Sequence, residues 1–159
     1  MKTAILFLAV CLYAACKSPK DAGEPLPSFD ILLADSSTHV NTAQVEAGRP
    51  IVLMYFSPDC EHCQKETKDI LQHMNALQEA RFLFVTIDAF DRLQVFNKYY
   101  QLSKYPNVML GRDEQFFLLR HFRGIAPPYL VLYDRNKKQR ASYQGDIAVD
   151  SLISVVNNL

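Results

Sequence analysis

Two cysteines separated by two residues are the side chains with the clearest capacity for chemistry in this 159-residue chain. They are Cys60 and Cys63, in the sequence Cys60-Glu-His-Cys63. Residues three apart on a helix share one face, so the two sulfur atoms can meet within disulfide geometry. The spacing therefore predicts a disulfide between Cys60 and Cys63 that opens and closes without movement of the fold.

The positions of the two cysteines predict different roles for them. A continuous apolar run at 51–56 precedes Cys60, and a helical pattern follows it. Cys60 is therefore expected at a helix N-terminus, where unpaired N–H groups and the helix dipole stabilise a thiolate, which makes it the expected nucleophile. Cys63 lies one turn deeper on the apolar face. We expect it to stay a thiol until it resolves a mixed disulfide on Cys60.

The periodicity of apolar residues predicts the elements that position this motif. Strands are expected at 29–33, 38–40, 51–56, 82–87, 108–110, 129–133 and 139–143, and helices at 60–79, 91–100, 113–122 and 149–159. Asp91 and Asp113 are expected to cap two of the helices, and Gly124 to follow a helix C-terminus. Alternating strands and helices, closed by an antiparallel hairpin, predict an α/β fold. We expect a central mixed sheet flanked by helices, with an N-terminal β-hairpin extension.

Composition places the chain among ordinary globular proteins. Apolar residues make up 49% of the chain and charged residues 21%, and the length suits one domain with a real core. The 17 basic residues equal the 17 acidic ones. No basic surface for nucleic acid is therefore predicted.

The N-terminus has the layout of an export signal. A basic start is followed by an apolar run to Ala15 that is too short to span a membrane, so residues 1–15 are predicted to be a signal peptide. Two alanines precede Cys16 and polar residues follow it, which resembles the lipobox of bacterial lipoproteins and implies lipidation of Cys16. An ordinary secretory signal with an incidental Cys16 is the alternative. Residues 16–27 are expected to form a tether and 28–159 the domain.

The segments 51–63 and 126–134 closely resemble the thioredoxin superfamily, and within it the TlpA/ResA-like exported thiol-disulfide oxidoreductases. The resemblance spans roughly residues 28–158 and implies a thioredoxin-like fold. It implies that Pro128 is a cis-proline facing the two cysteines and that Pro127 contacts their sulfur atoms. It also implies that Glu66 accepts the proton of Cys63. A solvated charge paired with a lysine is the alternative for Glu66.

Four residues near the motif bear on the role of the protein and on the direction of its redox reaction. The tryptophan usual before the first cysteine of the superfamily is Asp59, and the buried acid of thioredoxin itself is Met54, which argues against a general cytosolic thioredoxin role. An imidazolium at His62 would make the disulfide more oxidising, whereas Glu61 acts in the opposite direction. The residues alone leave the direction open. An exposed His62 without a role is the alternative.

The resemblance implies an enzyme of the bacterial cell envelope that reduces disulfides of exported proteins such as apocytochromes. Electrons would come from a membrane thiol carrier, and the protein would be held to the membrane by its lipid anchor. We expect a monomer with no metal, cofactor or nucleic acid. The alternatives are metal binding or copper delivery through Cys60, His62 and Cys63, a peroxiredoxin, and a non-catalytic thioredoxin-like binding domain.

Overall fold

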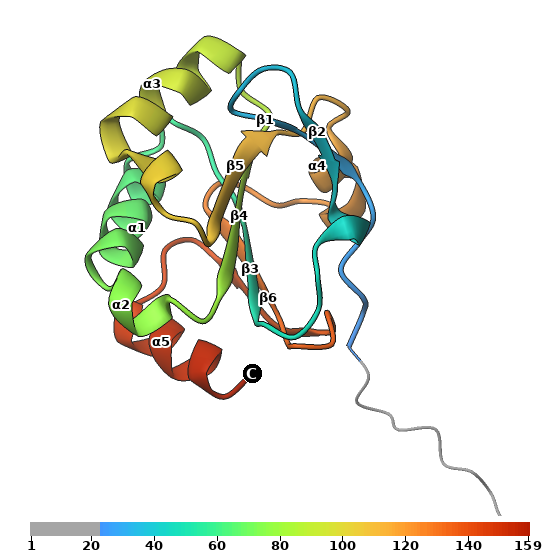
Figure 1. Cartoon of the computed structure of the whole chain (residues 1–159), viewed down its shortest axis with the longest axis vertical. Helices are drawn as coiled ribbons and strands as arrows, with labels where there is room; N and C mark the ends of the chain where they lie inside the picture. Colours follow the sequence, from blue (N-terminus) through green and yellow to red (C-terminus); the bar gives the residue numbers. More distant parts are fainter. Residues whose placement is uncertain (1–22) are drawn as a thin grey trace, which may run out of the picture.

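The computed structural model describes residues 23–159, so the predicted signal peptide and Cys16 lie outside the described residues. Its centre is a seven-stranded sheet in the order β2-β1-β5-β4-β3-β6-β7 (Figure 1). The strands are β1 (Asp30–Leu33), β2 (His39–Asn41), β3 (Ile51–Tyr55), β4 (Arg81–Thr86), β5 (Val108–Arg112), β6 (Tyr129–Tyr133) and β7 (Gln139–Gln144). Only β3, β4 and β5 run parallel to one another, which makes the sheet mixed, as predicted.

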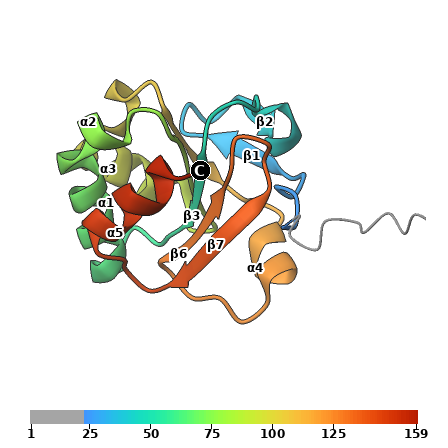
Figure 2. The same cartoon turned by 90° about the horizontal axis from the view of Figure 1, so that it is seen from below.

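Helices cover both faces of the sheet. They are α1 (Glu61–Gln72), α2 (Met74–Leu77), α3 (Phe90–Tyr100), α4 (Phe117–Phe122) and α5 (Val149–Asn157), with short 3-10 helices η1 (Thr42–Gln44) and η2 (Leu102–Lys104). The helices α1, α2, α3 and α5 lie over one face, and α4 lies over the other (Figure 2). This arrangement is the predicted thioredoxin-like α/β architecture.

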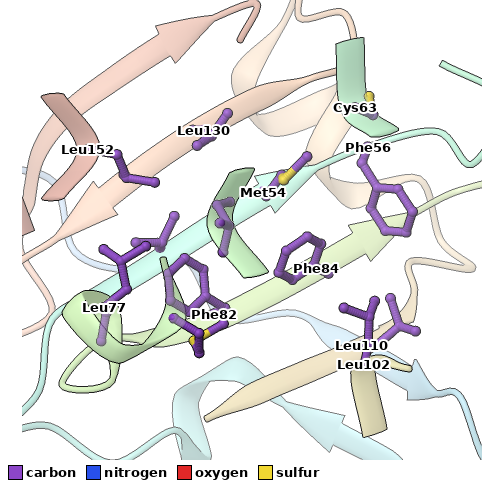
Figure 3. Packing of buried hydrophobic residues seen from close by; sticks show 14 of the residues in the cluster. Met54, Phe56, Cys63, Leu77, Phe82, Phe84, Leu102, Leu110, Leu130 and Leu152 are labelled. Carbon is purple, nitrogen blue, oxygen red and sulfur yellow. The ribbon is translucent and has the colours of Figure 1, made fainter. Parts of the chain in front are cut away.

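The strand β3 is buried on both faces because both faces carry helices. Its residues alternate between two apolar clusters: Val52 and Met54 belong to the cluster that includes α1, α3 and α5, whereas Leu53 and Tyr55 belong to the one that includes Leu118 of α4. Figure 3 shows part of the first cluster, with Cys63 at one end beside Phe56. The central strand therefore ends a short loop before the cysteine motif.

The seven predicted strands are all present, but the helix predicted at 60–79 is broken. His73 ends α1 with φ −110° and ψ 18°, and its N–H lies 3.2 Å from the carbonyl oxygens of both Asp69 and Ile70. Its ring Nδ1 also lies 2.9 Å from the Asp69 carbonyl oxygen. The side chain therefore competes for the helix backbone, and α2 begins as a separate segment.

Both predicted aspartate caps were wrong. The helix α3 begins at Phe90 with Ala89 as its N-cap, so Asp91 lies inside the first turn. The helix α4 begins at Phe117, four residues after Asp113. The buried Asp113 carboxylate nevertheless accepts the Leu118 N–H at 2.9 Å across the intervening loop.

The predicted hairpin extension is present and joins the sheet through β5. Within this pairing Gly111 lies opposite Leu33. Residues at the end of the predicted tether also contact the domain: Leu26 is buried, and its N–H donates to the Lys137 carbonyl oxygen at 2.9 Å. Gly124 has φ +72° just beyond α4, as expected for a residue that follows a helix end.

Gly111→Ala should destabilise the attachment of the hairpin. A Cβ at this position would lie 2.5 Å from the carbonyl oxygen of Leu32 and would also overlap the side chain of Ile31. Because backbone must move to make room, we expect the free energy of unfolding, measured in urea, to fall by about 2 kcal/mol. The control Ser142→Ala, on an exposed position of β7, should change it by less than about 0.5 kcal/mol. Equal effects of the two variants would contradict the close packing at Gly111.

Candidate active site

Cys60 is the N-cap of α1. It has an extended backbone, φ −82° and ψ 116°, and its sulfur accepts the backbone N–H of Cys63 at 3.3 Å. The helix starts here because β3 ends at Tyr55 and a short loop containing Pro58 separates the two elements. The sulfur of Cys60 thus occupies the position where a helix N-terminus stabilises negative charge.

The segment before β6 closes the other side of Cys60. The peptide bond between Pro127 and Pro128 is cis, as the resemblance implies. The Cys60 thiol lies 3.6 Å from the Pro127 carbonyl oxygen and donates to it. Cys60 therefore lies between α1 and the proline segment, and Pro127 contacts its sulfur as expected.

Cys63 lies beneath Cys60 in the apolar core. Both cysteines are free thiols, Cys60 half-buried and Cys63 fully buried. Burial raises the pKa of the Cys63 thiol far above its ordinary value, and the hydrogen bond with Cys60 and the charge of Glu66 act in the same direction. Cys63 is therefore held as a neutral thiol.

Glu66 is buried one turn after Cys63. Its side chain is 1% exposed and accepts the backbone N–H of Ile147 at 2.9 Å. Burial raises the pKa of this carboxyl to about 7, although the Ile147 N–H opposes the shift. The alternative of a solvated helix charge is thus excluded, and the carboxyl is suited to gain or lose a proton near neutral pH.

His62 and Glu61 lie on the exposed side of the motif. The His62 side chain is 72% exposed, and its Nδ1 lies 3.2 Å from a carboxylate oxygen of Asp146. Glu61 is exposed in the first turn of α1. The His62 ring therefore interacts with a carboxylate and not with the Cys60 sulfur.

Asp59 and Met54 are the two residues at which the chain departs from the superfamily pattern. Asp59, in the tryptophan position, forms an ion pair with Arg92 of α3 at 2.5 Å. Met54, in the position of the buried acid, is fully buried in the core. In this chain the buried carboxyl nearest to Cys63 in sequence is instead Glu66, supplied by α1 itself.

A groove of about 520 Å³ lies between α3 and the segment that includes Pro58, Asp59 and Gln64, on either side of Cys60 in sequence. Exposed apolar side chains of α3 form part of its wall, including Val95 and Tyr99. The remaining lining residues are Pro58, Asp59, Gln64, Asp91, Arg92, Phe96 and Tyr100.

The contacts of Asp146 and Ile147 were not expected from the sequence. Both residues belong to the loop between β7 and α5, and 81 positions separate Ile147 from Glu66. The loop carries no motif that would reveal a contact with α1. The contact is a product of the topology, which places α5 beside α1 (Figure 2).

Residues 23–159 also bear on metal binding and on membrane spans. No three His, Cys, Asp or Glu side chains in this part of the chain are grouped so that they could hold a metal ion. Among the same residues, every helix is too short or too polar to cross a membrane.

A dithiol motif at the start of a helix, following a central strand and facing a cis-proline, defines a thioredoxin-fold protein with a candidate redox site. Residues 40–159 match the family model of the thioredoxin-like domain, and the chain belongs to this family. A comparison with curated proteins found no match.

Solved structures of bacterial redox proteins share the fold. A secreted Mycobacterium tuberculosis disulfide oxidoreductase homologous to E. coli DsbE has a TM-score of 0.69 and 21% identity, over 82% of this chain and 96% of that one. DsbF from the same organism has a TM-score of 0.70 and 21% identity, over 82% and 93%. The exposed lipoprotein thioredoxin Etrx1 of Streptococcus pneumoniae has a TM-score of 0.64 and 17% identity, over 84% and 100%.

Glu66→Gln should change how stability depends on pH. Because the pKa of Glu66 rises from 4.5 to about 7 on folding, the native state holds a proton that the unfolded chain releases. The stability that this bound proton contributes is complete below the pKa of Glu66 in the unfolded chain. It is lost as the pH rises through the pKa of Glu66 in the folded protein. We expect the wild-type free energy of unfolding to fall by about 3 kcal/mol relative to Glu66→Gln between about pH 4.5 and about pH 8.

Urea denaturation across this range measures the difference. Glu61→Gln, which removes an exposed carboxylate from the same helix, should give a curve parallel to that of the wild type. If the free energies of unfolding of wild type and Glu66→Gln depended on pH in the same way, the raised pKa of the buried Glu66 would be contradicted.

Proposed function

We propose that this protein is an exported thiol-disulfide oxidoreductase of the TlpA/ResA-like kind, which reduces disulfides of cell-envelope proteins. The observation that carries the proposal is the asymmetry of the cysteine pair. Cys60 is half-buried at a helix N-terminus, and Cys63 is buried beneath it as a thiol next to the buried Glu66. Membership of the thioredoxin-like family and the fold shared with disulfide oxidoreductases support the same class of chemistry.

In the first step of the proposed reaction, the Cys60 thiolate attacks one sulfur of a substrate disulfide. A bond forms between Cys60 and that sulfur, the substrate S–S bond breaks, and the other substrate sulfur leaves as a thiolate and takes a proton from water. The Cys63 N–H, which donates to the Cys60 sulfur, stabilises the attacking thiolate.

In the second step Cys63 gives its proton to the Glu66 carboxylate and attacks the sulfur of Cys60. A Cys60–Cys63 disulfide forms, and the second substrate sulfur leaves and is protonated. Two electrons have then passed from the protein to the substrate, which ends as a dithiol. A membrane thiol carrier that becomes oxidised in turn restores Cys60 and Cys63.

The surroundings of His62 favour reduction over oxidation. An imidazolium that interacted with Cys60 alone would stabilise the thiolate and make the disulfide more oxidising. In this protein Asp146 lies 3.2 Å from the His62 ring and offsets its charge. Glu61, exposed beside it, adds negative charge to the same side of the motif.

We further propose that residues 1–15 are removed as a signal peptide and that lipid on Cys16 anchors the protein in a bacterial membrane. Leu26, which packs against the domain, follows Cys16 by only ten residues, so the anchor would hold the domain close to the membrane surface. Confinement there favours partners that are themselves exported or membrane-bound, such as apocytochromes and a membrane thiol donor. The exposed lipoprotein thioredoxin with the same fold supports this location.

Single-cysteine variants test the assigned roles of the cysteines. Cys63→Ser should accumulate a mixed disulfide with a protein such as insulin, seen as a heavier band on a non-reducing gel, because nothing resolves it. Cys60→Ser should form no such adduct and should lose insulin reduction by a factor on the order of at least 100. An adduct of equal yield on Cys60→Ser would contradict the assignment of Cys60 as the nucleophile.

Cys16→Ala tests the membrane anchor. In a bacterial expression host the wild type should sediment with membranes and should incorporate a labelled fatty acid. Cys16→Ala should do neither, because one acyl-bearing cysteine supplies the whole attachment. Membrane association that survives the substitution without label would contradict lipidation at Cys16.

A further inference from the structure

The loop between β7 and α5 is attached to α1 at three points. His62 Nδ1 lies 3.2 Å from Asp146 Oδ1, and Lys65 Nζ lies 3.4 Å from Asp146 Oδ2. The next residue of the loop, Ile147, donates its N–H to Glu66 Oε2 at 2.9 Å. Positions 62, 65 and 66 share one face of the helix, so a single side of α1 holds the loop.

The two kinds of attachment differ in burial. The contacts of Asp146 are accessible to water, with its side chain 30% exposed, whereas the bond between Ile147 and Glu66 is buried. Within the described part of the chain, Ile147 supplies the one hydrogen bond found to the Glu66 carboxylate. A buried carboxylate that lost this donor would be unpaired, and its neutral form would be favoured further.

We propose that Asp146 is a positioning residue for the resolving step: by fixing the loop to α1, it holds the Ile147 N–H on Glu66 and keeps this carboxylate available to accept the proton of Cys63. The inference rests on the proposed function, in which Glu66 takes that proton. Asp146 touches neither sulfur atom and acts through the backbone of the next residue.

Asp146 affects the pKa of Glu66 in two opposite ways, directly through its charge and indirectly through Ile147. Its own charge, like that of Asp69, raises the pKa of Glu66, whereas Lys65 lowers it. The Ile147 N–H that Asp146 holds in place also lowers it. Removal of the Asp146 carboxylate would therefore lower the pKa of Glu66 if only charge mattered. The same removal would raise it if positioning dominates.

The second step can be observed directly in the full chain carrying Cys11→Ala and Cys16→Ala in detergent, which leaves Cys60 and Cys63 as its only cysteines. Mixing the reduced protein with excess dithiobis(nitrobenzoate) should release thionitrobenzoate in two phases. The first phase is the attack of Cys60 on the reagent, and the second is the attack of Cys63 on the mixed disulfide. Stopped-flow absorbance from about pH 5 to about pH 9 gives the profile of each phase.

We expect Asp146→Ala to move the midpoint of the second phase upward by about one pH unit and to slow that phase about fivefold at pH 7, because fewer Glu66 side chains are ionised. The first phase should not change. Asp146→Asn keeps an oxygen that can accept from Lys65, and its second phase should stay within about twofold of the wild type. Asp150→Ala, an exposed acid of α5, should change neither phase.

A downward shift of the midpoint in Asp146→Ala, or an unchanged second phase, would overturn the inference. If Glu66→Gln left the second phase unchanged, Glu66 would not be the proton acceptor, and the role of Asp146 would fall with it while thiol exchange itself survived. The absence of both phases in the parent protein would instead remove the proposed exchange reaction altogether.

Discussion

The hydrogen bond from the Cys63 backbone N–H to the sulfur of Cys60 is the interaction around which the candidate site is built. It exists because α1 starts at the residue after Cys60 and because β3, buried on both faces, ends only five residues earlier. The same sulfur lies 3.6 Å from the Pro127 carbonyl oxygen at the entry to β6, the antiparallel neighbour of β3. The order of the sheet therefore determines which groups face the Cys60 sulfur, the proposed nucleophile.

Cys60, Cys63 and Glu66 differ in burial, and their roles in the proposed reaction differ accordingly. Cys60 is half-buried and, in the proposed reaction, meets the substrate, while Cys63 and Glu66 are withdrawn from water and hold their protons more tightly than they would in solution. A buried thiol beside a carboxyl that titrates near neutrality can pass one proton without solvent. The cost is stability at higher pH, which is a common compromise at sites built for proton transfer.

Local patterns were enough to predict much of this molecule. The apolar run at 51–56, the spacing of Cys60 and Cys63, and the paired prolines each depend on neighbouring residues, and each prediction about their place in the fold agrees with the structure. The break at His73 was missed because a side chain competes for the helix backbone there. The attachment of the loop at Asp146 was missed because it joins segments that only the finished sheet brings together.

The reduction potential of the Cys60–Cys63 couple distinguishes a reductase from a protein that forms disulfides. Equilibration of the domain from residue 17 onward against a dithiothreitol series should show one reversible two-electron couple, with a potential below about −230 mV, as expected for a reductase. A potential near about −120 mV would contradict reduction and indicate a protein that forms disulfides. The absence of any reversible couple would contradict thiol-disulfide exchange as the function of this site.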